Sequence, residues 1–442
     1  MLINFIEDKI LAPLILKFLR LCEYQQDQKS FKTKLKIKES LKTYNMNTLK
    51  VLTVTASVFA FLSAGKISDN RCSSKANERE IVESNISNQP QISVSKDNKI
   101  QVALLLDTSN SMDGLIDQAK SRLWNIVNTL TTLKYNGQAP QVEIALYEYG
   151  NDGLKDENYI RQVTPLTQDL DLVSEKLFAL KTNGGNEYCG AVIRDASANL
   201  KWDGNEKSMK LIYIAGNEPF DQGKISYKDV ISKAKTKNIY TNTIFCGSRE
   251  EGIQSHWQNG ASLGDGKYFN IDSDQKVIYI ETPYDVKISQ YNSKLNDTYI
   301  SYGNRGYEMK NKQTTQDSNA EMQSASNAVE RAVSKSKKNA YKNDHWDLVD
   351  KVEKDKSYIS SIKEEELPSE LKGKSKDEIK KIVAQKSADR DKIQKEIEVL
   401  ARKRQEFIDV ETKKRGSSEG DDLGKAIERS IVELAKKNGY SF

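Results

Sequence analysis

The sequence is poor in the residues that build metal clusters and disulfide frameworks. Of its 442 residues, four are cysteine, two are histidine and seven are proline. So few cysteines and histidines exclude a zinc-rich protein and a disulfide-stapled domain. An excess of one charge is also lacking, because 68 basic and 63 acidic residues are interleaved and leave a net charge of +5. This balance is typical of a solvated surface and argues against DNA or RNA binding.

The apolar content limits how much of the chain forms a compact core. Apolar residues make up 37% of the sequence and charged residues 30%. A chain of this length accommodates two or three domains of about 100–200 residues. The low apolar content favours one good core followed by a long, solvated helical region.

The beginning of the chain contains a pattern typical of protein export. Lys50 precedes a run of apolar or small residues at 51–64, which matches a signal peptide and is too short for a transmembrane helix of about 20 residues. We therefore predict that residues 46–65 are a signal peptide or an uncleaved N-terminal anchor. Met46 is then the working start, and residues 1–45 are an upstream extension of the reading frame.

Two alternatives for this region stay open. Residues 5–21 also fit an amphipathic helix that lies on a membrane. Cys72 follows the apolar run, as a lipid-anchored cysteine does, although Arg71 before it replaces the small residue that lipoprotein processing requires. Residues 66–97 are polar and predict a flexible linker. Export predicts a periplasmic or cell-envelope location.

From residue 99 onward, short apolar runs alternate with amphipathic segments. Strands are expected at 100–106, 142–147, 159–166, 209–215, 239–245 and 266–271, and helices at 115–133, 170–180, 190–200 and 230–237. This alternation predicts a doubly wound, mostly parallel α/β sheet over residues 98–282. In such sheets, ligands bind at the carboxyl ends of the strands.

Residues 283–442 have a different character, with a single proline, Pro368, after Pro283 and many charged residues. Helices are expected at 315–336, 376–412 and 421–437. The second carries a narrow stripe at three- and four-residue steps, formed by Ile393, Ile397, Leu400, Arg404, Phe407 and Ile408. The stripe predicts an α-helical, partly coiled-coil region. Helices that pack on one another or on the α/β domain are the favoured alternative.

Three oxygen-bearing side chains at alternate positions follow the first expected strand. Asp107, Ser109 and Ser111 precede a helix that begins near Gly114, and their oxygens can converge on one centre. Oxygen ligands suit hard cations such as Mg²⁺ or Ca²⁺. One carboxylate and two hydroxyls leave the charge of the ion under-compensated, so an open coordination position would attract an acidic side chain of a partner protein. Capping of the following helix is the structural alternative.

This Asp-x-Ser-x-Ser motif after an apolar strand resembles the metal-ion-dependent adhesion site (MIDAS) of the von Willebrand factor type A (VWA) family. The resemblance spans residues 98–275. It implies a metal-binding, protein-binding domain whose site is completed by a threonine from a second loop and an aspartate after the fourth strand.

The sequence departs from the family pattern at both of these places. In the second loop, Thr182 precedes two glycines, and Asn186 or Glu187 stands at the usual threonine position. After the fourth strand, Gly216 takes the aspartate position and leaves Asn217 or Glu218 to supply an oxygen. The resemblance therefore implies a variant site with the metal ligands Asp107, Ser109, Ser111, Thr182, Glu187 and Asn217.

Segments 295–303, 316–320 and 345–349 are similar to the tail of an uncharacterised group of bacterial exported proteins that carry this domain. This likeness implies a bacterial cell-envelope setting and no particular activity.

Cys189 and Cys246 are both expected near the carboxyl edge of the sheet. An oxidising compartment would allow a disulfide between them, and two separate buried thiols are the alternative.

The sequence contains no recognisable catalytic set. His256 and His345 each stand beside a tryptophan, which is more typical of packed histidines than of general bases. We therefore predict a non-catalytic protein-binding module with an unknown protein partner and no nucleic acid. The alternative is a metal-independent interaction or scaffold protein that binds mainly through its helical C-terminal region.

Overall fold

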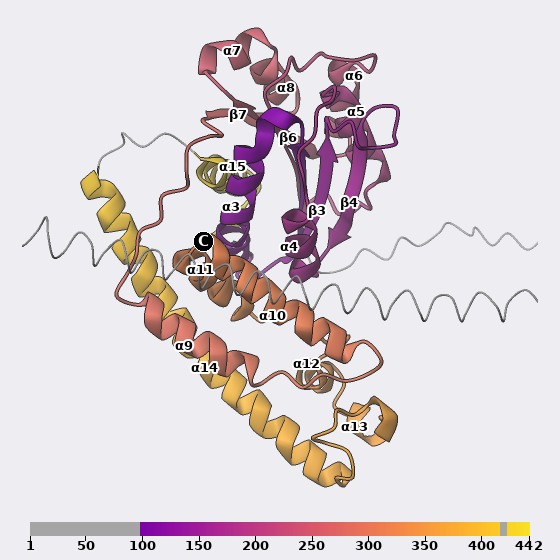
Figure 1. Ribbon diagram of the computed structural model, residues 1–442, viewed down its shortest axis with the longest axis vertical. Coiled ribbons are helices and arrows are strands. Elements are labelled where there is room, and N and C mark those ends of the chain that lie inside the picture. Colours follow the sequence, from indigo (N-terminus) through magenta and orange to yellow (C-terminus); the bar gives the residue numbers. More distant parts are fainter. Residues whose placement is uncertain (1–97, 416–421) are drawn as a thin grey trace, which may run out of the picture. The chain divides into compact units, whose positions relative to one another are not determined.

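A computed structural model describes residues 98–415 and 422–442 (Figure 1). The predictions for residues 1–45, 46–65 and 66–97, which include the signal peptide or anchor and the linker, lie outside these described residues. No helix of the described residues is long and apolar enough to cross a membrane.

A six-stranded sheet lies at the centre of residues 99–271, with the strand order β4-β3-β1-β5-β6-β7. All neighbouring strands are parallel except β3 and β4, which are antiparallel. Its strands are β1 (Lys99–Asp107), β3 (Gln141–Tyr149), β4 (Ile160–Thr167), β5 (Met209–Gly216), β6 (Ile239–Cys246) and β7 (Asp265–Ile271). This confirms the predicted doubly wound, mostly parallel sheet.

Strand β1 is buried on both faces of the sheet because helices cover each face (Figure 1). Val102 and Leu104 pack with α3 (Asp113–Thr132) and α4 (Leu170–Phe178). Ala103 and Leu105 face the other way, toward a cluster formed with three helices. These are α5 (Cys189–Asn199), α6 (Tyr227–Lys235) and α8 (Trp257–Leu263), with α7 (Arg249–Gln254) beside α8. A run of apolar residues without alternation therefore suits this strand.

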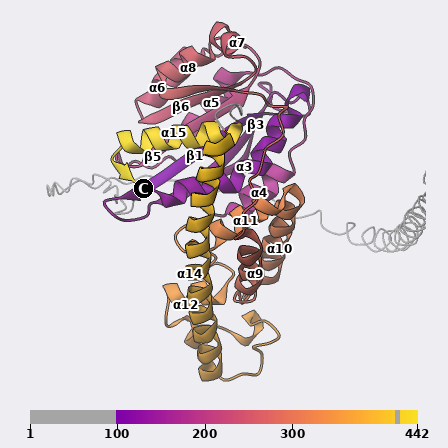
Figure 2. The ribbon, with the colours of Figure 1, turned by 90° about the vertical axis from the view of Figure 1, so that its left-hand side faces the viewer.

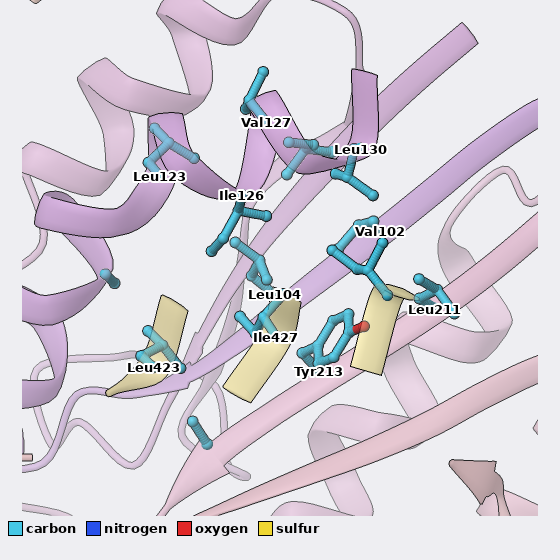
Figure 3. Packing of buried hydrophobic residues seen from close by; sticks show 14 of the residues in the cluster. Val102, Leu104, Leu123, Ile126, Val127, Leu130, Leu211, Tyr213, Leu423 and Ile427 are labelled. Carbon is cyan, nitrogen blue, oxygen red and sulfur yellow. The ribbon is translucent and has the colours of Figure 1, made fainter. Parts of the chain in front are cut away.

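The α/β core also contains a helix from the far end of the sequence, α15 (Leu423–Lys437). Figure 3 shows its residues Leu423 and Ile427 among side chains of β1, β5 and α3. The short strand β8 (Tyr440–Ser441) pairs with β2 (Lys134–Tyr135), directly after α3. The chain thus leaves the α/β core after β7 and re-enters it at α15. The helical segment between these two elements is termed the excursion.

The excursion consists of helices that pack on one another (Figure 2). They are α9 (Asp285–Asn296), α10 (Gly306–Gln323), α11 (Ala325–Lys335), α12 (Leu348–Lys354), α13 (Tyr358–Ser361) and α14 (Lys376–Arg415), with a single 3-10 turn at Glu364–Glu366. The stripe on α14 buries Ile397 and Leu400 against the shorter α9 and α11. The partly coiled-coil arrangement is therefore not confirmed, because α14 meets short helices along this stripe.

The helix expected at 315–336 is divided into α10 and α11 at Ser324. The backbone of Ser324 is extended, and its hydroxyl accepts a hydrogen bond from the amide of Asn327 at 2.9 Å. Serine is a favoured N-cap because its oxygen satisfies a free amide of the first turn. No proline or glycine marks this break in the sequence, so the segment was expected to form one continuous helix.

A buried ion network joins the excursion to the α/β core. Arg331 of α11 donates to Asp171 of α4 at 2.7 Å, and Lys335 donates to Asp317 of α10 at 2.8 Å. Arg331 and Lys335 are almost wholly buried. Burial raises the pKa of Asp317, but the charges of Lys335 and Arg331 outweigh it and hold that pKa well below its usual range. Each buried charge therefore has an opposite charge beside it, as burial requires.

The substitution Asp317→Asn should lower the free energy of unfolding by about 3–5 kcal/mol at neutral pH, because it leaves two buried cations under-compensated. The ion pairs of Asp317 are fully present above the ordinary aspartate pKa of about 4. They are lost as the pH falls through the lowered folded pKa. The difference between the two proteins should therefore shrink below about pH 4.

Denaturant unfolding at several pH values measures this difference. The matched control is Asp377→Asn, because Asp377 is exposed and its ion pair with Lys380 lies in solvent. Equal effects of the two substitutions would contradict the structural role of the network.

The substitution Ile431→Ala should destabilise the α/β core by about 2–5 kcal/mol, because Ile431 of α15 is fully buried. Val399→Ala on the solvent side of α14 is the control, since that side chain is 42% exposed. Its effect should stay within about 0.5 kcal/mol. Urea unfolding followed by circular dichroism checks both, and a negligible effect of Ile431→Ala would show that α15 does not hold the core together.

Candidate metal site

Asp107 ends β1 at the carboxyl edge of the sheet and is fully buried. Its Oδ1 accepts a hydrogen bond from the amide of Ser109 at 2.8 Å. Its Oδ2 has no hydrogen-bond partner among the described residues. Buried polar atoms without a partner are rare and call for an explanation, such as an ion that binds there.

The two serines of the motif lie next to this carboxylate. The hydroxyls of Ser109 and Ser111 are 3.4 Å apart, on a turn that includes the 3-10 helix Asn110–Met112. Ser111 Oγ accepts a hydrogen bond from Asn217 Nδ2 at 3.2 Å. This contact joins the loop after β1 to the loop after β5. Asn217 Oδ1 is a second buried oxygen without a partner among the described residues.

Glu187 comes from the loop before α5, and its side chain points to the same place. A Cβ atom at Gly150 would lie 2.8 Å from Asp107 Oδ1 and 2.8 Å from Glu187 Cγ, so both side chains flank one point. The structure thus brings together five of the six predicted ligands, Asp107, Ser109, Ser111, Glu187 and Asn217.

Burial and repulsion between like charges perturb both carboxyl groups. Burial raises the pKa of Asp107 to about 7 against the hydrogen bond from the Ser109 amide, and the charges of Glu187 and Glu218 raise it further. The pKa of Glu187 is also raised to about 7, first by burial and then by the charge of Glu218. Asp152 adds a smaller repulsion to Glu187. A divalent cation at this point would compensate these charges.

Thr182 does not join this cluster. Its hydroxyl donates a hydrogen bond to Asp113, in the first turn of α3. Glu187, and not Thr182, therefore lies beside Asp107. The sequence places Asn186 or Glu187 at the position where the family has a threonine ligand. Within the described parts of the chain, no group of three or more His, Cys, Asp or Glu side chains has the geometry of a metal site. An ion here would therefore depend on hydroxyl and amide oxygens as well as carboxylates.

Tyr149 leaves no room for a side chain at position 216, where the family resemblance would place an aspartate. Its hydroxyl donates to the carbonyl of Ala215 at 2.9 Å and fills the space beside Gly216. A Cβ atom at Gly216 would overlap this hydroxyl and would lie 2.9 Å from Asp107 Oδ2. Sequence reasoning missed Tyr149 and Gly150. Their position at the carboxyl end of β3, next to β1 in the sheet, was the available signal.

The two cysteines are free, buried thiols, which corrects the disulfide considered from the sequence. Cys189 lies in the core cluster on the α5 side of the sheet, and Cys246 lies in the cluster on the α3 side. The sheet therefore separates the two side chains. Burial raises the pKa of both thiols.

Comparison with known proteins identifies the α/β part of the chain. The family model of the von Willebrand factor type A domain matches residues 101–277. Residues 101–277 are therefore a VWA domain, and the predicted resemblance to this family is confirmed. A search of curated proteins found no match.

Several solved structures resemble this domain. The conserved hypothetical protein BatB from Bacteroides thetaiotaomicron is 16% identical, with 39% of this chain and 90% of that chain covered and a TM-score of 0.31. An aerotolerance-related membrane protein from Bacteroides fragilis is 17% identical, with 40% and 93% covered and a TM-score of 0.28. Proximal thread matrix protein 1 from the mussel byssus, with a zinc-occupied MIDAS motif, is 14% identical, with 41% and 44% covered and a TM-score of 0.31. At these values the likeness carries no information on function.

The substitution Gly150→Ala tests how closely the loops meet. Gly150 has a φ of +79°, and an added Cβ would collide with Asp107 and Glu187. We expect a loss of about 2–4 kcal/mol of unfolding free energy from backbone strain and overpacking together. Gly137→Ala is a matched control, because Gly137 has a φ of +78° and nothing within 4 Å of the added atom. It should cost about 1 kcal/mol. Equal losses in urea unfolding would show that the loops do not meet as described.

Proposed function

We propose that this protein is a non-catalytic protein-binding module of the bacterial cell envelope, in which the VWA domain carries a variant MIDAS. Asp107 Oδ2 carries this proposal, because it is a buried carboxylate oxygen without a partner, beside two further oxygen donors. VWA domains are generally interaction modules and not enzymes, which supports a binding role. The signal-peptide pattern at residues 46–65 supports export, with a periplasmic or envelope location and N-terminal membrane association as its consequence.

The donors around Asp107 suit Mg²⁺ or Ca²⁺. Ser109 and Ser111 supply hydroxyl oxygens and Asn217 supplies an amide oxygen, whereas no histidine or cysteine takes part. Hard cations prefer such oxygen ligands. The ion would supply positive charge at the carboxyl edge of the sheet, where the loops after β1 and β5 meet. Asp107, Ser109 and Ser111 would hold it through their side-chain oxygens.

A metal-independent interaction or scaffold protein that binds mainly through the helical region is the second candidate. A surface groove of about 380 Å³ between α9 and α14 favours it, lined by residues that include Tyr291, Lys294, Lys386, Lys392 and Glu396. Capture of a partner from envelope extract that persists in the presence of a chelator would favour this candidate.

The substitution Asp107→Ala should abolish the heat of Mg²⁺ and Ca²⁺ binding in a calorimetric titration, because it removes the one carboxylate of the loop after β1. Asp229→Ala is the control, since Asp229 lies exposed on α6 of the same domain. This control should bind the ions like the unaltered protein. If the unaltered protein gives no heat with either ion, the metal site is refuted.

A further inference from the structure

Glu187 is the feature in which this site departs most from an open adhesion site. Only 6% of the residue is exposed, although it lies in a loop. A Cβ atom at Gly150 would lie 2.8 Å from Glu187 Cγ and 2.8 Å from Asp107 Oδ1, so the two side chains meet beside Gly150. A glutamate on a surface loop normally extends into water, because burying an unpaired carboxylate is costly. Its inward direction therefore requires a structural cause and a compensating charge.

The backbone on both sides of Glu187 holds the side chain in this direction. The amide of Glu187 donates to Gln222 Oε1 at 2.7 Å. Before it, the amide of Asp152 donates to the carbonyl of Gly184, and Gly185 lies so close to the carbonyl of Gly150 that a side chain would not fit. After it, α5 begins at Cys189, whose side chain is buried. The loop is thus fixed at both ends, and Glu187 has little freedom to leave the site.

We propose that Glu187 is an internal carboxylate ligand that occupies the coordination position a partner's acidic side chain would otherwise take. This inference rests on the proposed function, since it presumes that an ion binds at Asp107. Asp107 and Glu187 together carry two negative charges, which balance one divalent cation. The neutralised ion has no net attraction for a third carboxylate.

The surroundings of Glu187 add to this effect. Glu218 and Asp152 lie near enough to repel its charge. The edge of the sheet therefore remains negative when the ion is bound, and an acidic side chain that approaches it is repelled. The partner of this site accordingly presents basic or neutral groups to it. The ion acts as a link between the loop after β1 and the loop before α5.

Terbium luminescence tests this arrangement, because Tb³⁺ replaces Ca²⁺ at oxygen sites and its lifetimes in H₂O and D₂O give the number of bound water molecules. We expect Glu187→Ala to bind about one more water molecule than the unaltered protein and to bind Ca²⁺ about tenfold more weakly, because alanine has no oxygen that could ligate the ion. Addition of acetate should then displace that water in Glu187→Ala and leave the unaltered protein unchanged. Glu218→Gln is the matched control, since it removes a neighbouring charge and no proposed ligand; its number of bound water molecules should not change.

The outcomes separate the two proposals. If the unaltered protein binds neither Tb³⁺ nor Ca²⁺, the metal site fails and this inference fails with it. If the ions bind and Asp107→Ala abolishes binding, but Glu187→Ala leaves the number of bound water molecules unchanged, only the role of Glu187 is overturned. Far-UV circular dichroism of Glu187→Ala confirms that the comparison is made between folded proteins. Displacement of water by acetate in the unaltered protein would equally overturn the closed site.

Discussion

The burial of β1 on both faces of the sheet is the constraint on which the rest of the structure depends. Because its residues face two separate clusters, helices must cover both faces, and the chain supplies them from distant segments. The same burial places Asp107, at the end of the strand, where water does not reach. A carboxylate there is costly unless its charge is compensated. The loops after β1, β3 and β5 and the loop before α5 all approach this one group, so the architecture and the candidate site have a common origin.

Most of the α/β fold was predictable, because its strands are continuous apolar runs and its helices have clear apolar faces. The motif at Asp107, Ser109 and Ser111 was also visible, since its members are close in sequence. The features that the sequence did not reveal depend on which strands are neighbours in the sheet and on which face each side chain lies. Tyr149 excludes a side chain at position 216 only because β3 and β5 both flank β1. The separation of Cys189 and Cys246 by the sheet likewise requires knowledge of which face each residue occupies.

The helical excursion was harder to anticipate because charged pairs, and not an apolar seam alone, join it to the VWA domain. Asp171 and Arg331 are far apart in sequence, and each is an ordinary charged residue when considered alone. Arg331 also lies over the ring of Trp124 of α3, with its guanidinium carbon 4.6 Å from the ring centroid. Such contacts give no periodic signal, so composition suggested a solvated region where the structure has buried ion pairs. The excursion and the domain are consequently parts of one packed unit.

The return of α15 to the VWA core has a consequence for the order of folding. Residues 423–440 fill a layer beside α3, so residues 101–277 cannot close their own core until this distant segment has been made. Contacts between segments this far apart in sequence slow folding, because a long loop must be closed before they form. Until α15 arrives, one face of the nascent sheet exposes apolar side chains. The chain therefore gains an extended interval in which it is accessible to chaperones and has not yet reached its final shape.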